Sequence, residues 1–240
     1  MKALIFNSGV GTRLGELTKT SPKCMTYLDE SNTILKLQLE SLALLDVEEV
    51  IITTGPFEEM LKDYVASLPQ KPPVRFVQNP LYTETNYIYS MYCARDFIKD
   101  DNVIVLHGDL VFDISVLRDL MAVDTHSVAA IDFQSPLPEK DFKAKIENGK
   151  IQSISVDLSG RDCYACQPLY MFLQRDFSVW LSRVCDFCEN GNVKVYAENA
   201  LNEISNQIDF RALDLKSRLC KEIDNMEDLE SVSAIFRGEK

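Results

Sequence analysis

Short apolar runs alternate with amphipathic stretches through about the first 125 residues of the chain. Three apolar runs each end in a polar turn, which is typical of buried strands in a parallel sheet: KALIF at 2–6, EVIITTG at 49–55 and NVIVLHGD at 102–109. Between them, apolar residues recur every three or four positions, which predicts helices over 34–45, 57–68 and 86–98. This alternation predicts a Rossmann-like, doubly wound α/β fold that binds its ligands at the carboxyl ends of the strands.

The second half of the chain has a different pattern. Two alternating runs flank Asn148-Gly149 within 141–157, and this combination is typical of a β-hairpin. The remaining pattern predicts a strand over 163–173, helices over 174–189, 196–206 and 226–237, and short strands over 207–213 and 219–223. We therefore expect a mixed but mostly parallel sheet with an added hairpin region, and a single domain over 1–240.

Composition narrows the class of protein. An apolar content of 46% in 240 residues is enough for a sizeable packed core. With 25 basic and 37 acidic residues the formal charge is −12, which would repel nucleic acids and anionic membrane surfaces. The chain has no signal-peptide core and no apolar run of membrane length, and its seven cysteines suit a reducing compartment. We expect a cytoplasmic protein, and its oligomeric state stays open, with a homodimer among the options.

A glycine-rich loop that begins at Gly9 follows the first predicted strand, where a phosphate-binding turn would lie. A dinucleotide-binding loop has glycines at relative positions 1, 3 and 6, but Leu14 occupies the sixth position. The loop of P-loop ATPases, in which Gly-Lys follows a first glycine after four residues, fits from neither Gly9 nor Gly11. Counting thus excludes both familiar glycine loops.

Two cations extend the glycine loop. Arg13 offers a planar fork of donors and Lys23 a point charge, while the glycines let backbone N–H groups approach an anion closely. This combination suits the phosphates of a nucleoside triphosphate. The simpler alternative is a strand-to-helix turn with two solvated cations.

The order G-V-G-T-R-L and then S-P-K resembles the opening signature of nucleotidyltransferases that activate sugar phosphates and small phosphorylated alcohols. The resemblance implies that Arg13 steadies the leaving pyrophosphate and Lys23 the α-phosphate. It also implies that Asp109, at the end of a predicted strand, and Asp224, in the late segment EID, bind Mg²⁺ together. Taken alone, each aspartate would suit a turn or a helix N-cap equally well.

Three further segments, at 79–94, 195–203 and 221–229, resemble bacterial CTP-dependent cytidylyltransferases of phosphocholine. The segment at 135–146, together with the opening FNSG, resembles the phosphoglutamine enzymes most, with the aminoethylphosphonate enzymes as the nearby option. The resemblance implies a fold of the nucleotide-diphospho-sugar transferase type, with a nucleotide-binding half over 1–125 and an acceptor-binding half over 126–240. It implies CTP as one substrate and a small phosphorylated or phosphonate acceptor as the other, with phosphoglutamine favoured, for capsule or cell-surface decoration. A sugar-1-phosphate nucleotidyltransferase stays the alternative.

The resemblance also implies a set of nucleotide-binding residues. These are Asn7, Ser8, Gly9, Gly11, Thr12, Asn79 and Asn86. In this family two small residues usually precede the loop glycine, so the pair Asn7-Ser8 is a departure that would add hydrogen bonds to the base or ribose.

The acceptor site is predicted from three side chains. Lys143 and Lys145 lie two residues apart, on one face of a predicted strand, and are candidates to meet the acceptor's phosphate; an exposed basic strand face is the alternative. Glu198 is a candidate partner for an ammonium group, or else a solvated helix residue. Ala197 stands where an aromatic residue of a choline-binding cage is expected, which makes choline doubtful.

The cysteines raise a rival function. Cys163 and Cys166, then Cys185 and Cys188 after eighteen residues, have the spacing of a structural zinc site and would define a zinc-bearing interaction domain. The first pair lies in a predicted strand at an odd separation, which points the two thiols to opposite faces. The second pair continues the apolar face of a predicted helix, so packing explains it.

Overall fold

The computed structural model describes residues 1–9 and 11–239, and of Thr12, Arg13 and Glu16 it describes the backbone only. The strands are β1 (Lys2–Asn7), β2 (Glu49–Thr54), β3 (Val74–Gln78), β4 (Val103–His107), β5 (Leu110–Phe112), β6 (Ser127–Asp132), β7 (Lys143–Glu147), β8 (Lys150–Ser155), β9 (Cys163–Phe172), β10 (Phe210–Asp214) and β11 (Cys220–Glu222). The helices are the 3-10 segments η1 (Thr12–Thr18) and η2 (Lys23–Met25) and the α-helices α1 (Ile34–Leu44), α2 (Glu58–Ser67), α3 (Tyr87–Ile98), α4 (Ile114–Met121), α5 (Gln174–Glu189), α6 (Ala197–Glu203) and α7 (Met226–Phe236). Within the described ranges, no helix is both long and apolar enough to span a bilayer.

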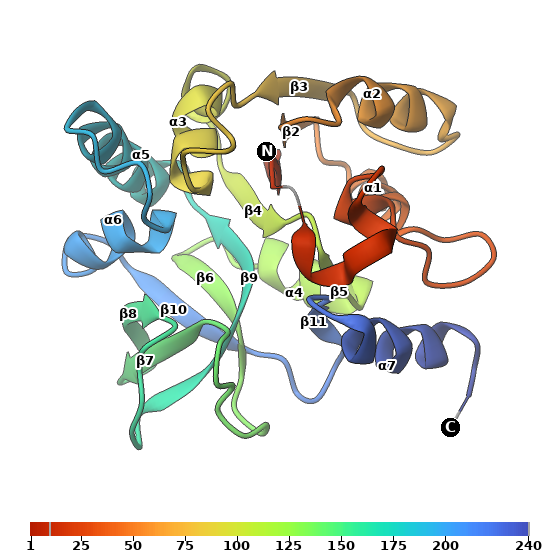
Figure 1. Ribbon diagram of the computed structural model, residues 1–240. Helices are drawn as coiled ribbons and strands as arrows, with labels where there is room; N and C mark the ends of the chain where they lie inside the picture. The colour runs from red at the N-terminus through yellow and green to blue at the C-terminus, as the bar shows by residue number, and fades with distance from the viewer. Residues whose placement is uncertain (10, 240) are drawn as a thin grey trace.

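The main sheet of the described chain has nine strands in the order β3-β2-β1-β4-β9-β6-β10-β8-β7 (Figure 1). The strands β3, β2, β1 and β4 pair in parallel, and β10 is parallel to β6. In contrast, β9 runs antiparallel to both β4 and β6, and the hairpin β7–β8 joins the far edge. The predicted mixed sheet with an added hairpin is confirmed.

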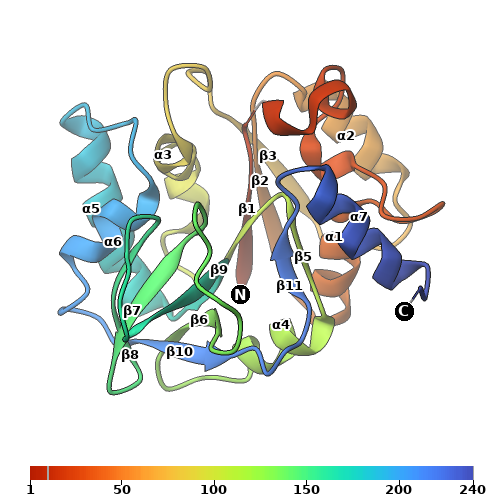
Figure 2. The same ribbon diagram turned by 60° about the horizontal axis from the view of Figure 1, so that its bottom comes forward.

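Helices cover both faces of this sheet (Figure 2). The helices α3, α5 and α6 lie on one side and α1, α2 and α4 on the other, with α7 beside α1. The core under α3, α5 and α6 contains many aromatic rings, among them Tyr170, Phe172 and Trp180. A smaller cluster that includes Ile223 and Leu229 packs α7 against the ribbon of β5 and β11, which fixes the position of Asp224 between them.

Six elements of the described chain were not predicted from the sequence: the 3-10 segments η1 and η2, the strands β3, β5 and β6, and the helix α4. The edge strand β3 is only partly buried, so it has no continuous apolar run, and β5 is three residues long. A signal for α4 was available, because Asp113 caps this helix by accepting a hydrogen bond from the backbone N–H of Ser115.

Candidate active site

A cleft at the carboxyl ends of β1 and β4 contains two adjoining pockets, which share Phe6, Gly9, Tyr87 and Asp109 as lining residues. The first pocket, of about 340 Å³, is called the Lys23 pocket here, and its other lining residues are Asn7, Gly11, Pro22, Lys23, Gly108 and Asp224. The second pocket, of about 190 Å³, is called the Asn79 pocket, and its other lining residues are Ser8, Asn79, Tyr82, Thr85, Asn86, Ser90 and His107. The ligand site therefore lies where a doubly wound sheet is expected to present it.

The glycine loop borders the Lys23 pocket. Gly11 and Gly15 have φ angles of 63° and 58°, a left-handed conformation that glycine adopts without steric cost. Thr18 fixes the loop by donating a hydrogen bond from Oγ1 to the carbonyl of Gly11, at 2.5 Å. The side chains of Thr12 and Arg13, both predicted to contact the nucleotide, lie outside the described residues.

Lys23 lies between two carboxylates that are far from it in the sequence. Its Nζ is 2.6 Å from Asp109 Oδ2 and 2.6 Å from Asp224 Oδ1. Burial disfavours the charged ammonium, but the charges and hydrogen bonds of Asp109 and Asp224 outweigh it and raise the pKa of Lys23. Neither aspartate is a helix N-cap, since Asp113 caps α4 and Asn225 caps α7. The structure thus brings together three of the predicted site residues.

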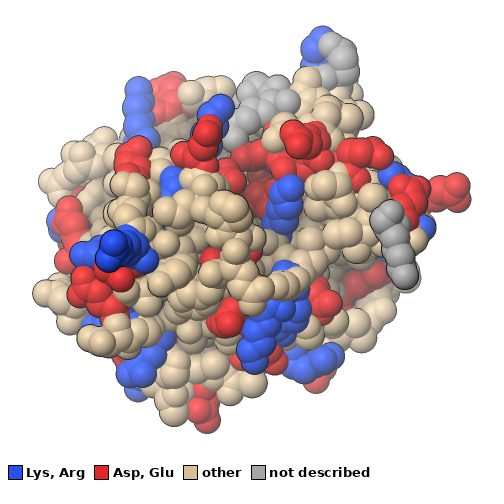
Figure 3. Space-filling view, turned by 90° about the horizontal axis from the view of Figure 1, so that it is seen from below, with Lys and Arg blue, Asp and Glu red and all other residues tan. Residues whose placement is uncertain are grey.

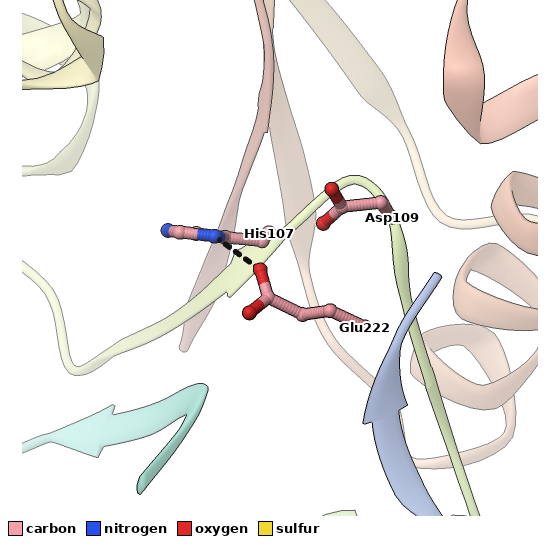
Figure 4. A group of neighbouring side chains, drawn as sticks. All are labelled: His107, Asp109 and Glu222. Carbon is pink, nitrogen blue, oxygen red and sulfur yellow. Dashed lines mark hydrogen bonds and ion pairs between the residues drawn. The ribbon is translucent and has the colours of Figure 1, made fainter. Parts of the chain in front are cut away.

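The possible metal ligands around Asp109 suit a hard divalent cation. Asp109 Oδ1 is buried and has no hydrogen-bond partner among the described residues. Among the described residues, the ligand atoms of His107, Asp109 and Glu222 lie within 4.8 Å of one another (Figure 4). Carboxylate oxygens are the ligands that Mg²⁺ prefers in proteins. Together with Asp224, these oxygens would suit a magnesium ion.

His107 and Glu222 form a partly buried pair beside Asp109, with His107 Nδ1 2.8 Å from Glu222 Oε1. Burial opposes protonation of the imidazole, but the hydrogen bond and charge of Glu222 outweigh it and raise the pKa of His107 to about 9. Burial, and then the charge of Asp109, raise the pKa of Glu222 to about 7, against the opposing effect of His107. The pair therefore retains a proton at neutral pH and offsets part of the negative charge in the cleft.

Neutral hydrogen bonds line the Asn79 pocket. Asn79 Nδ2 donates to Thr85 Oγ1 at 3.0 Å and to Ser90 Oγ at 3.1 Å, and Ser90 Oγ donates to Ser8 Oγ at 3.0 Å. Asn79 Oδ1 accepts from the backbone N–H of Leu81 at 2.9 Å. The pocket offers hydroxyl and amide groups that carry no charge, which suits the base and ribose of a nucleoside.

Asn86 lines both the Asn79 pocket and a third pocket, which also contains Glu198. Its side-chain oxygen caps α3 by accepting a hydrogen bond from the backbone N–H of Tyr87 at 2.7 Å. The backbone N–H of Asn86 donates to the carbonyl of Val193. Asn79 and Asn86 therefore both line the cleft, as predicted. Their contacts with a nucleotide stay a prediction.

Glu198 is buried in the first turn of α6, so its alternative interpretation as a solvated helix residue was wrong. Its Oε2 accepts a hydrogen bond from the hydroxyl of Tyr87, and its Oε1 accepts one from Tyr170 at 3.1 Å. Burial and the charge of Glu198 raise the pKa of both tyrosines, which keeps their hydroxyls protonated as donors. Glu198 is thus a carboxylate held in place by two neutral groups.

Aromatic rings lie next to this carboxylate. A pocket of about 320 Å³, called the Glu198 pocket here, is lined by Glu198, Phe142 and Tyr196, among other residues. The ring centroids of Phe142 and Tyr196 are 5.1 Å apart, and those of Tyr87 and Tyr196 are 5.8 Å apart. Aromatic faces and a carboxylate attract the same ligand group, a cation.

Position 197 is alanine where an aromatic residue was expected, but the Glu198 pocket still contains aromatic side chains. Ala197 is fully buried in the core, and its carbonyl accepts a hydrogen bond from Trp180 Nε1 at 3.0 Å. The neighbouring residue, Tyr196, lines the Glu198 pocket instead. The argument against choline from Ala197 was therefore wrong.

A fourth pocket, of about 290 Å³, is partly lined by Glu222 and Asp224 and is called the acidic pocket here. Its charged lining residues are Asp132, Asp141, Lys221, Glu222, Asp224 and Asp228. Lys221 pairs with Asp228 at 2.8 Å. Acidic side chains also gather on part of the face seen from below (Figure 3). This side of the cleft attracts cations.

Lys143 and Lys145 were predicted to contact the acceptor's phosphate, but in the structure both have other partners. Lys143 is buried, and its Nζ donates to the carbonyls of Glu139 and Val156. Lys145 is about half exposed and forms an ion pair with Glu147 at 2.9 Å. Neither lines the four pockets described above. We therefore correct that prediction and assign neither lysine a contact with the acceptor.

The cysteines do not form the zinc site of the rival function. One pair lies on β9 and the other on α5, and the four thiols are free. Among the described residues, the one group with ligand atoms close enough to hold a metal is that of His107, Asp109 and Glu222. Burial of Cys163, Cys166 and Cys188 agrees with a packing role.

Sequence reasoning omitted several site residues from the predicted set, although a signal existed for two of them. His107 and Glu222 each precede a predicted metal ligand by two residues, and residues two apart in a strand point to the same face. No comparable spacing relates Tyr87, Phe142 and Tyr196, because they come from three separate segments of the chain.

Comparison with known proteins defines the family to which the chain belongs. The family model described as Nucleotidyl transferase matches residues 2–134, more than half of the chain. The chain belongs to this family, as its opening signature indicated, and it is a nucleotidyltransferase.

Particular relatives narrow the comparison. The chain is 25% identical to the CTP:phosphoglutamine cytidylyltransferase of Campylobacter jejuni subsp. jejuni serotype O:2, over 96% of this chain and 98% of that protein. It is also 25% identical to the choline-phosphate cytidylyltransferase of Streptococcus pneumoniae, over the full length of both. The solved structure of the CTP:phosphocholine cytidylyltransferase from Streptococcus pneumoniae has a TM-score of 0.82 over 98% of both chains, at 22% identity. The predicted fold type is thereby confirmed.

Proposed function

We propose that the protein is a Mg²⁺-dependent cytidylyltransferase that transfers CMP from CTP to a small phosphorylated or phosphonate acceptor. The observation that carries this proposal is the convergence of Lys23, Asp109 and Asp224 in one pocket beside the glycine loop. These groups suit a triphosphate with its metal, and two full-length relatives are named for CTP-dependent reactions.

In the proposed reaction, an oxygen of the acceptor's phosphate or phosphonate attacks the α-phosphorus of CTP in line, and the bond to pyrophosphate breaks. The nucleophile is already ionised at neutral pH, so the reaction needs no general base. When bound at Asp109 and Asp224, Mg²⁺ would supply positive charge to the phosphate chain. Lys23 steadies the α-phosphate and Arg13 the departing pyrophosphate, and catalysis comes mainly from positioning and charge stabilisation.

The nucleoside of CTP is assigned to the Asn79 pocket, because Ser8, Asn79 and Ser90 offer neutral donors and acceptors there. Ser8, Asn79 and Asn86 would surround the base and ribose there. Gly9 and Gly11 would present the loop backbone to the phosphates in the adjoining Lys23 pocket.

The acceptor is assigned to the side of the cleft that holds the Glu198 and acidic pockets. Phosphoglutamine, 2-aminoethylphosphonate and phosphocholine each carry a cationic nitrogen besides the phosphorus group, and a carboxylate with aromatic neighbours recognises such a nitrogen. Sugar 1-phosphates carry no such cation, so this pocket favours the first three acceptors over the sugar alternative. Among them phosphoglutamine stays our first choice, for a product used in capsule or cell-surface decoration.

Pyrophosphate release tests the proposal. Purified protein is assayed with each of the four NTPs and Mg²⁺, crossed with phosphoglutamine, 2-aminoethylphosphonate, phosphocholine and glucose 1-phosphate. We expect turnover with CTP and an acceptor that carries a cationic nitrogen. Turnover of glucose 1-phosphate alone would support the sugar-1-phosphate alternative.

The metal assignment is tested in the same assay with Asp109→Ala, which should reduce turnover by at least about 10²-fold because the metal loses a ligand. The control is Asp119→Ala on α4, which removes an exposed carboxylate that pairs with Arg218 and should leave turnover unchanged. Full activity of the Asp109 variant would contradict the assignment.

A further inference from the structure

Asn7, the last residue of the central strand β1, carries a polar group that the fold does not use. Its Nδ2 is buried and has no hydrogen-bond partner among the described residues. A buried amide N–H without a partner destabilises the fold, so such a group is expected to have a partner in the functional state.

The amide lies close against Gly108, and the backbone of Asn7 is well fixed. A Cβ added to Gly108 would lie 1.8 Å from Asn7 Oδ1, so the glycine leaves the space that the amide fills. The backbone of Asn7 is fixed by its pairing with β2 and by the hydrogen bond from its N–H to Thr53 Oγ1 at 3.3 Å. The group is therefore pre-organised between the ends of β1 and β4.

Asn7 and Ser8 face different pockets although they are neighbours in the chain. Ser8 lines the Asn79 pocket, where its hydroxyl joins the hydrogen bonds of Ser90 and Asn79. Asn7 lines the Lys23 pocket, with Lys23 and Asp109. Consecutive side chains of an extended strand point to opposite sides, which explains the division. The two residues therefore contact different parts of the nucleotide.

We propose that Asn7 Nδ2 donates a hydrogen bond to a non-bridging oxygen of the α-phosphoryl group and stabilises the charge that develops there during nucleotidyl transfer. The inference rests on the family's reaction at the α-phosphorus and not on the choice of CTP. It also changes the expected role of Asn7 from a contact with base or ribose to a catalytic residue.

The proposed step needs no proton transfer. The bond from the acceptor oxygen to the α-phosphorus forms while the bond to the pyrophosphate oxygen breaks, and pyrophosphate leaves with the electron pair. In the transition state negative charge lies on the non-bridging oxygens, and a fixed donor aimed at one of them stabilises this state more than the ground state.

The experiment compares Asn7→Ala and Asn7→Asp with Ser8→Ala, using the NTP that the wild-type enzyme turns over. Asn7→Asp keeps the shape that packs on Gly108, so it serves if the alanine variant unfolds. We expect Asn7→Ala to lower kcat by about 10²-fold with the KM for the NTP changed by less than about threefold, as for removal of one oxyanion donor. Asn7→Asp should be slower still, because a carboxylate repels the phosphoryl oxygens. Ser8→Ala should instead raise the KM.

Phosphorothioates separate a direct contact from a structural effect. The two diastereomers of the α-thio NTP each replace one non-bridging oxygen by sulfur, a weaker hydrogen-bond acceptor. Wild type should be slowed by the isomer whose sulfur faces Asn7, and Asn7→Ala should lose the slowing by that isomer alone. An unchanged kcat in both Asn7 variants, or equal loss of rate with the NTP and both thio isomers, would overturn the inference. Use of another NTP by the wild type would refute only the choice of CTP.

Discussion

The proposed nucleotide and acceptor sides of the cleft are built from different chemistry. The Lys23 pocket is their junction, because it shares Asp109 with the Asn79 pocket and Asp224 with the acidic pocket. The Asn79 pocket, on the proposed nucleotide side, is lined mainly by uncharged amide and hydroxyl groups that satisfy one another, and its charged groups are those of His107 and Asp109. The Glu198 and acidic pockets on the acceptor side combine aromatic rings with several carboxylates. Neutral hydrogen bonds read the edge of a base, whereas carboxylates and rings read charge, so the two sides select their ligands by different properties.

This difference teaches where substitutions should act. Losing a neutral hydrogen bond costs about 1 kcal/mol, whereas losing a buried charge that faces a ligand charge costs more. Substitutions at the junction should therefore affect rate, those on the acceptor side should strongly affect acceptor KM, and those on the nucleotide side should weakly affect nucleotide KM.

The largest effect is expected at the junction, for Lys23→Met. The substitution keeps the length of the side chain but removes the charge that contacts Asp109 and Asp224. We expect kcat to fall by about 10²–10³-fold, because a donor aimed at developing phosphoryl charge is lost. Steady-state pyrophosphate release measures it, with Lys62→Met, an exposed residue on α2, as the control. A rate within threefold of wild type would remove Lys23 from the catalytic site.

The next effect concerns the charged acceptor side. Glu198→Gln removes the negative charge in nearly the same volume. Its amide oxygen still accepts from one of the hydroxyls of Tyr87 and Tyr170, and the other hydroxyl can accept from the amide N–H. We expect the KM for a cationic acceptor to rise about 10–100-fold, the range for loss of a charge-assisted contact, with the KM for CTP unchanged. The matched control is Glu203→Gln, since Glu203 lies at the end of the same helix in an exposed pair with Arg183. Equal effects on both KM values would mean that Glu198 supports the fold of the cleft instead.

The contrast between the two sides also explains which site residues the sequence could predict. Lys23, Asp109 and Asp224 each belong to a short segment that resembles a motif of the family, so their convergence was predicted from that resemblance. Lys143 was not placed correctly, because strand periodicity gives the face of a residue but not its neighbours. In the structure β7 pairs with both β8 and β9, and Lys143 is left 4% exposed.

The aromatic residues of the acceptor side could not be predicted from spacing. Tyr87 begins α3, Phe142 directly precedes β7 and Tyr196 directly precedes α6, so only tertiary packing makes them neighbours. The overall fold was easier to predict, because alternating strands and helices have few arrangements that bury both faces of a parallel sheet.

A smaller effect is expected on the neutral side, for Ser90→Ala. The substitution removes the hydroxyl that joins Ser8 to Asn79, and both partners can turn to a ligand or solvent instead. We expect the KM for CTP to rise about three- to tenfold, equivalent to one neutral hydrogen bond, and the acceptor KM to stay constant. Ser67→Ala, at the end of α2, is the control because its exposed hydroxyl donates to the local carbonyl of Tyr64. A rise above about 100-fold would show that the nucleotide side depends on more than neutral hydrogen bonds.

The smallest effect is expected for Lys145→Ala, which tests the boundary of the charged side. Lys145 forms a surface pair with Glu147, and exposed pairs of this kind contribute little to stability. If the acceptor is read by Glu198 and its aromatic neighbours, both KM values should stay within about twofold of wild type, and the melting temperature should change by no more than a few degrees. Kinetics with the preferred acceptor and thermal unfolding measure both quantities. A selective rise in acceptor KM would return Lys145 to the acceptor site and extend the charged side of the cleft to the outer surface of β7, where a cation would then meet the acceptor's phosphate.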